Sequence, residues 1–198
     1  MGALQRVARG EGLIRLGLLR TLGVDFVPGL VARYLRENPG WNLRFTFHTG
    51  VTQQLLEGLL EKQFDLAFCS QPPAALQLTA VPAGRQDVVL IVPRSHPLAE
   101  FHTVDLADTL SGLFAQIGGT PKIAYETEED QVIAGLVAHG FGISVVPYME
   151  MLLRLDVKIL QISRPVLERN FYLVSNDKIY LPPAVRQFRQ YVLNGGYL

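Results

Sequence analysis

The chain has 198 residues, of which 48% are hydrophobic and 18% are charged, a balance typical of a globular fold rather than a disordered or fibrous chain. The 18 Lys and Arg residues offset the 18 Asp and Glu residues, so the formal net charge is zero. Without a basic excess to displace counterions from nucleic acid, this chain alone is expected not to bind DNA or RNA.

No apolar stretch approaches the roughly 20 residues of a membrane helix, and the N-terminus lacks the pattern of a signal peptide. The single cysteine, Cys69, excludes an internal disulfide and a CxxC pair. We therefore expect a soluble, cytoplasmic protein with no membrane partner.

The first part of the chain alternates short apolar runs with apolar stripes of helical period. Leu43, Phe45 and Phe47 alternate with polar residues, which predicts an edge strand with one buried face. Because parallel crossovers usually contain a helix, the pattern predicts a parallel sheet covered on both faces. The predicted elements are a strand at Leu13–Leu18, a helix at Phe26–Leu35, a strand at Leu43–Phe47, a helix at Leu55–Leu60 and a strand at Asp65–Cys69.

A second alternation follows Pro72 and Pro73 and predicts another lobe of the same kind. Its predicted elements are strands at Leu78–Pro82 and Val88–Val92, a helix at Leu110–Ile117, a strand at Lys122–Tyr125, a helix at Gln131–His139, a strand at Gly142–Val146 and a short helix at Met149–Leu155. Strands at Val157–Ile162 and Phe171–Val174 and a helix from Val185 to Val192 close the chain.

Several segments together carry a family pattern: Glu11–Gly17, Phe26–Pro28, Asn38–Pro39, Leu59–Ala67, Ser95–Ala99, Val104–Leu106 and above all Gly135–Pro147. In this order and spacing they resemble the effector-binding domain of LysR-type transcriptional regulators. The resemblance implies an α/β fold of two doubly wound, periplasmic-binding-protein-like lobes joined by two crossing strands. Lobe one would comprise residues 12–84 and 163–198, and lobe two residues 85–162.

The sequence departs from that family in two places. Residues 1–11 hold at most a remnant of the linker helix, so the DNA-binding helix-turn-helix is expected to be absent, and DNA would be a partner only through that missing domain. After Asp108 the second lobe looks short by one strand and a ligand-facing loop.

Ligands of open α/β sheets bind beyond the carboxyl ends of the strands, where helix N-termini offer free amides. The resemblance places a small-molecule effector between the lobes, at these same turns, with Thr21 and Thr52 as first choices. Two plainer interpretations stand beside this one: Thr52 only caps its helix, and Arg20 is only a solvated surface residue. The predicted effector-binding residues are Arg20, Thr21, Leu22, Thr49, Thr52, Ser70, Thr127 and Phe141.

In the second lobe, Thr127 and Asp130 have the spacing of an N-cap and its acidic third residue. Glu128 and Glu129 add negative charge at the same place. An anionic effector would be repelled there, so a carboxylate or phosphate is expected to point to lobe one, near Arg20.

The sequence gives little support for an enzyme. Its four histidines, His48, His96, His102 and His139, lack the spacing of a zinc site, and no GxSxG elbow is present. The glycines around Phe141 follow a helix and open a strand, which predicts a helix stop rather than a dinucleotide loop. No cofactor and no metal are expected. Thiol sensing at Cys69 is the minor alternative to a small buried hydrophobic residue.

Self-association into a homodimer or higher homo-oligomer is predicted from the free edge of the strand at Leu43–Phe47; the plainer alternative is a monomer with an ordinary packed face. The resemblance implies an antiparallel dimer that pairs the first helix and this strand with the second lobe of another subunit. The predicted dimer-interface residues are Leu30, Tyr34, Phe45, Phe47, Val132 and Leu136.

These observations support the hypothesis that the chain is the effector-binding and dimerisation domain of a bacterial LysR-type transcriptional regulator. It would sense a small molecule and act on transcription through attached DNA-binding domains. The alternatives are a solute-binding protein of a transporter and a two-lobe metabolic enzyme.

Overall fold

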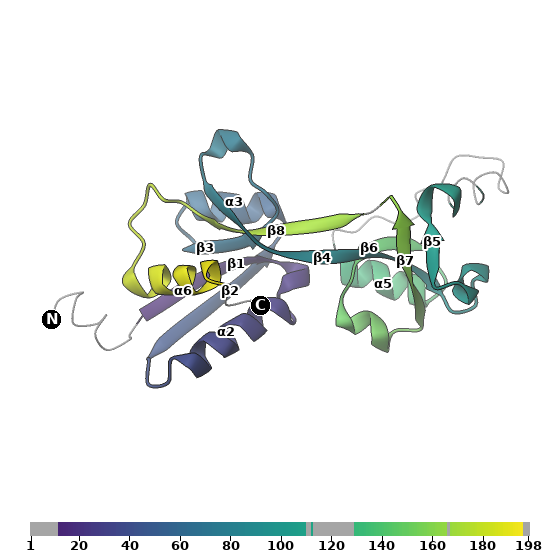
Figure 1. Cartoon of the computed structure of the whole chain (residues 1–198), viewed down its shortest axis with the longest axis horizontal. Coiled ribbons are helices and arrows are strands. Elements are labelled where there is room, and N and C mark those ends of the chain that lie inside the picture. Colours follow the sequence, from purple (N-terminus) through teal and green to yellow (C-terminus); the bar gives the residue numbers. More distant parts are fainter. Residues whose placement is uncertain (1–11, 110–111, 113–128, 166, 196–198) are drawn as a thin grey trace. The chain divides into compact units, whose positions relative to one another are not determined.

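The computed structural model describes residues 12–109, 112, 129–165 and 167–195. It divides into two compact units, unit 1 with Met1–Arg85 and Asn170–Leu198, and unit 2 with Gln86–Arg169. Strands β4 (Thr79–Pro93) and β8 (Glu168–Ser175) each run from one unit into the other (Figure 1). The chain returns to unit 1 at Asn170, later than the expected residue 163, because β7 (Val157–Arg164) pairs within unit 2 up to its end.

The sheet of unit 1 is built around β1 (Gly12–Leu19). This strand pairs in parallel with β2 (Leu43–Gly50) on one side and with β3 (Leu66–Cys69) on the other. Beyond β3 lies β8, which runs antiparallel to it. In the strand order β2 stands at the end, so the predicted edge strand is confirmed.

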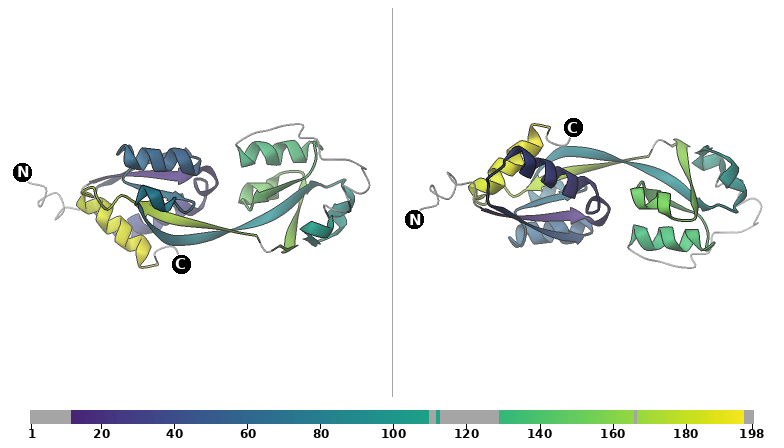
Figure 2. Two further views of the ribbon diagram at one scale, coloured as in Figure 1. Left: turned by 90° about the horizontal axis from the view of Figure 1, so that it is seen from above. Right: turned by 90° about the horizontal axis from the view of Figure 1, so that it is seen from below.

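Both faces of this sheet are covered by helices. Figure 2 shows α3 (Thr52–Leu60) on one face, and α2 (Phe26–Glu37) and α6 (Pro183–Leu193) on the other. On the α2 and α6 face the Tyr34 ring meets the Phe188 ring edge-on at 5.1 Å between centroids. On the α3 face a Cβ at Gly58 would lie 2.2 Å from the Phe64 ring, so a glycine there permits the close approach of α3 to the sheet.

The segment after β8 is tied to the rest of unit 1 through Asp177. Its carboxylate accepts hydrogen bonds from the hydroxyls of Thr79 and Ser175, each at 2.8 Å, and lies 3.5 Å from Arg189 Nη2. Although partial burial opposes the shift, the two hydroxyls and the guanidinium together hold the pKa of Asp177 below its ordinary value.

Unit 2 is built around the second half of β4. This half pairs antiparallel with β6 (Ser144–Pro147) and with β7, while β5 (Thr103–Asp105) pairs in parallel with β7. The helix α5 (Asp130–Ala138) contributes Ala134 and Val137 to a core with Val89 and Ile91. Short 3₁₀ helices occupy Ala74–Leu76 in unit 1, and Pro97–Glu100 and Glu150–Arg154 in unit 2.

Several predictions about the chain after Pro73 were wrong. The two strands expected at 78–82 and 88–92 form one strand, β4, which passes through Pro82, and the short strand β5 was not predicted. The expected parallel sheet is mostly antiparallel in unit 2, because alternation of strands and helices does not by itself fix strand direction. The helix expected at 110–117, apart from Gly112, and the strand at 122–125 lie outside the described residues. Within the described part of the chain, every helix falls short of the length and apolarity of a membrane span.

Candidate functional site

The candidate site lies where the three parallel strands of unit 1 end together. Leu18 is paired with Thr49 of β2 and with Phe68 of β3, so the carboxyl ends of the three strands reach the same sheet edge. The 3₁₀ turn Arg20–Leu22 follows β1, α3 follows β2, and Ser70 follows β3. The predicted residues Thr21, Thr49, Thr52 and Ser70 therefore come to one edge of unit 1.

Direct contacts join these turns. The Ser70 amide donates a hydrogen bond to Thr52 Oγ1 at 3.4 Å, which links the end of β3 to the start of α3. A Cβ at Gly23 would lie 3.1 Å from Leu18 Cδ1 and 3.5 Å from Thr49 Cγ2, so the turn after β1 packs against the end of β2. The strand-end site, defined as Arg20, Thr21, Thr49, Thr52 and Ser70, is thus a continuous group of turns.

Thr52 does not have the capping role considered above. It is the first residue of α3, whose N-cap is Val51, and the Thr52 hydroxyl makes no capping hydrogen bond to this helix. Gln54 Oε1 instead accepts a hydrogen bond from the Val51 amide at 3.2 Å. Since the first amides of a helix have no intrahelical acceptor, the start of α3 provides hydrogen-bond donors and a partial positive charge at this edge.

The site residues differ in how much surface they expose. Arg20, Thr21, Thr52 and Ser70 are half-buried, and Thr49 is exposed. Arg20 is therefore not simply a solvated surface arginine. Leu22 is buried in the hydrophobic core of unit 1, so its side chain belongs to the core; the turn that exposes its neighbours directs Leu22 inward.

Cys69 ends β3 beside this site, but its thiol is shielded. It is fully buried, and burial raises the pKa of the thiol to about 12. At neutral pH the sulfur is protonated and weakly nucleophilic. This environment is that of a small hydrophobic residue rather than of a thiol sensor.

The predicted site residues of unit 2 are only partly among the residues that the structure describes. Thr127 lies outside the described residues. Asp130 is the first residue of α5, with Glu129 at the N-cap, and not the third residue as its spacing suggested. Phe141 is exposed, and its amide donates to the Leu136 carbonyl at 3.1 Å while Gly140 has a φ of +81°, which confirms the predicted helix stop.

The histidines and acids of the described residues form no metal-binding group of three or more. His96 has a local structural contact: its Nδ1 accepts a hydrogen bond from the Leu98 amide at 3.2 Å, at the start of the 3₁₀ helix Pro97–Glu100. Nothing in this arrangement requires a ligand.

Two of the predicted dimer residues belong to the core of their own unit. Leu30 and Tyr34 are each only 3% exposed, because the apolar stripe of α2 faces its own sheet and α6. Phe45 is half-buried against Tyr34 and Phe188. Phe47 and Val132 remain accessible, at 47% and 49% exposure, and Leu136 is half-buried.

Comparison with known proteins places this geometry in a family. The family model described as "LysR substrate binding domain" matches residues 8–196. The "Uncharacterized HTH-type transcriptional regulator YybE" of Bacillus subtilis is 27% identical over 201 residues, which cover 93% of this chain and 68% of that protein. The "Transcriptional dual regulator GltC" of the same organism is 25% identical over 204 residues, which cover 92% and 67%. The chain thus spans about two thirds of the length of these relatives.

A solved structure agrees with these relatives. The effector-binding domain of QuiR in complex with shikimate has a TM-score of 0.83 and 32% sequence identity to this chain, and the match covers 94% of this chain and 97% of that one. This likeness confirms the predicted periplasmic-binding-protein-like fold. Since the family model spans nearly the whole chain and the relatives are transcriptional regulators, the chain belongs to the LysR substrate-binding domain family.

Proposed function

We propose that this chain senses a small organic effector at the strand-end site of unit 1. The observation that carries the proposal is the common register of β1, β2 and β3, which brings Thr21, Thr52 and Ser70 to one sheet edge. This is the place where open α/β sheets bind ligands. The complex of the similar QuiR domain with shikimate supports a small polar effector.

The chemistry of the site favours a molecule with hydroxyl or carboxylate oxygens. Half-buried hydroxyls of Thr21, Thr52 and Ser70 provide short, directional hydrogen bonds. The start of α3 adds amide donors and a partial positive charge. In unit 2, Glu129 and Asp130 place negative charge at the start of α5, so we propose that an anionic group of the effector faces unit 1, near Arg20.

The action on transcription would require a DNA-binding domain in the whole protein. Effector binding would favour one conformation of the regulator and thereby change the geometry of the attached DNA-binding domains. The chain itself would perform no covalent chemistry and would act in the cytoplasm.

We also propose that the chain forms a homodimer through the edge of unit 1. Strand β2 is the last strand of its sheet, and Phe47 is exposed on it. A strand edge with an exposed aromatic side chain is normally covered, and a second copy of the chain would cover it here. Val132 and Leu136 on α5 provide a second apolar surface for a two-fold contact.

A thermal-shift screen of small organic acids, with shikimate included, tests the proposed function. A ligand at 100 times its Kd adds about 2.7 kcal/mol to the free energy of unfolding. Thr52→Val should abolish the shift of the best ligand, and Thr103→Val, the same change at an exposed position in unit 2, should preserve it. An unchanged Kd in Thr52→Val, or no stabilising ligand among the acids, would contradict the proposal.

A further inference from the structure

A pocket lies in unit 1 toward the amino ends of β1 and β3. Its volume is about 220 Å³. It is lined by residues from β1, the end of α3 and the segment between β8 and α6, including Arg15, Lys62, Phe64, Tyr180 and Leu181. All of these belong to unit 1. An apolar cavity of about 150 Å³ is large enough for benzene, so this pocket can hold a one-ring compound.

The polar wall of the pocket has a fixed cation. Arg15 Nη2 donates to Asp65 Oδ1 at 2.7 Å, Arg15 Nε donates to Asp65 Oδ2 at 3.3 Å, and Nη1 donates to the Lys62 carbonyl at 2.9 Å. The hydrogen bond to Asp65 is the main cause that raises the pKa of Arg15. Because the guanidinium has more N–H donors than these contacts use, Arg15 is held in place and can still donate to a ligand.

The net charge of the wall is positive. Asp65 is balanced by Arg15, with their side chains in direct contact. Lys62 then supplies a further positive charge, and its backbone has a φ of +61°, an uncommon conformation for a residue other than glycine. Helices commonly end with a residue in this left-handed conformation, and Lys62 directly follows Glu61, the C-cap of α3.

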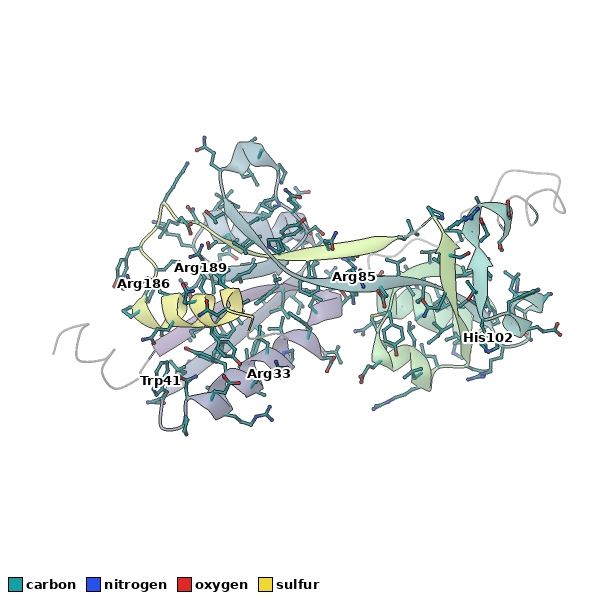
Figure 3. The ribbon with its side chains drawn as sticks, viewed as in Figure 1. Arg33, Trp41, Arg85, His102, Arg186 and Arg189 are labelled. Atoms are coloured by element: carbon teal, nitrogen blue, oxygen red, sulfur yellow. The ribbon has the colours of Figure 1, made fainter. Side chains whose placement is uncertain are left out.

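The apolar wall contains one exposed aromatic side chain. Tyr180 is 70% exposed and lines the pocket together with its sequence neighbours Ile179 and Leu181. The Arg186 guanidinium stands 5.6 Å from the Tyr180 ring centroid, and Figure 3 shows Arg186 on α6. This cation–π contact orients one side of the ring. A flat apolar ligand can cover the ring surface that remains.

We propose that unit 1 carries a second small-molecule site at this pocket, for a one-ring aromatic monocarboxylate. Lys62 and the remaining N–H donors of Arg15 face its carboxylate, and Phe64, Tyr180 and Leu181 contact its ring. The site is separate from the strand-end site, because Arg15 lies within β1 and Asp65 precedes β3, whereas the strand-end residues follow both strands. The proposal does not depend on the proposed function of the strand-end site.

Titration of the 198-residue chain with benzoate, followed by amide chemical shifts in NMR spectra, tests this proposal. We expect saturable shifts at the amides of Arg15, Lys62, Phe64 and Tyr180, with a Kd on the order of 1 mM. Benzamide, which has the same ring without the charge, should bind about tenfold more weakly.

Two variants and one control make the test specific. Lys62→Gln should weaken benzoate binding about tenfold and leave benzamide binding unchanged, while Tyr180→Ala should weaken both. Lys158→Gln, the same substitution in unit 2, should change neither. The spectrum of each variant without ligand reports whether its fold is retained, and either pocket variant alone is sufficient for the test.

Three results would overturn the proposal. The first is the absence of saturable shifts at the pocket amides. The second is shifts confined to the strand-end site, which would support that site and not this one. The third is benzoate binding in Lys62→Gln and Tyr180→Ala that equals binding to the unchanged chain. Thr52→Val distinguishes the two sites further, since benzoate binding at the pocket should persist in it.

Discussion

The two ends of the unit 1 sheet are built from different chemistry. At the carboxyl ends of the strands, most side chains are neutral hydroxyls, and the positive charge comes from Arg20 and from the start of α3. At the amino ends, Arg15 and Asp65 form an ion pair that is fixed by several hydrogen bonds. Hydroxyl groups can rotate toward a ligand at little cost in free energy. The Arg15–Asp65 ion pair is instead a fixed part of the fold, and it also borders a pocket.

Strand β3 runs between these two ends, and the largest effect that we expect is on the labelling rate of the cysteine at its carboxyl end. Cys69, at its carboxyl end, has a thiol pKa raised to about 12 by burial. The thiolate at neutral pH is therefore about a thousandfold scarcer than in an exposed cysteine. Iodoacetamide should label Cys69 in the folded chain at least about a thousandfold more slowly than in the urea-unfolded chain. Rapid labelling of the folded chain would mean that the strand end is open.

Among the substitutions considered, loss of the ion pair at the amino end should lower the free energy of unfolding most. Asp65→Asn removes the negative charge that holds Arg15, and we expect a loss of about 2 kcal/mol in the free energy of unfolding. Asp156→Asn is the matched control, because Asp156 pairs with Arg94 while both side chains are largely exposed, and it should change stability by less than about 0.5 kcal/mol. Equal losses in urea unfolding would show that Arg15 and Asp65 form no more than a surface pair.

The carboxyl end should tolerate the loss of a hydroxyl. In Thr52→Val the Ser70 amide loses a partner that is 3.4 Å away, and we expect a cost of at most about 1 kcal/mol without ligand. Thr103→Val should stay within about 0.5 kcal/mol. A much larger loss in thermal unfolding of Thr52→Val would make the strand-end site a structural support, like the Arg15 end.

The smallest effect is the pH dependence contributed by Asp177. Its folded-state pKa is lowered, so the folded chain binds this proton less readily than the unfolded chain does. The stabilisation is present above the unfolded pKa of about 3.9 and is lost as the pH falls through the folded pKa. Asp177→Asn should therefore lower stability at neutral pH by about 0.5 kcal/mol, with the difference vanishing in acid. A difference that grows in acid would contradict the assigned direction of the shift.

Sequence patterns predicted the parallel part of unit 1 well because that information is local. The alternation of Leu43, Phe45 and Phe47 identified β2 as the edge strand, and the strand ends identified the turns that meet at the site. The family pattern extended this to the whole chain, as the match over residues 8–196 confirms.

What the sequence could not predict depends on contacts between distant residues. Arg15 and Asp65 are 50 positions apart, and neither has a local signature of pairing. An apolar stripe such as that of Leu30 and Tyr34 looks the same whether it faces its own core or another subunit. The antiparallel pairing of β4 with β6 and β7 was missed for the same reason.

The most direct test is an amide chemical-shift map of the chain with the best ligand from the thermal-shift screen. The strand-end account predicts that the amides of Thr21, Thr52 and Ser70 move with one common Kd. A map in which these amides stay unchanged while the ligand saturates other residues would contradict it.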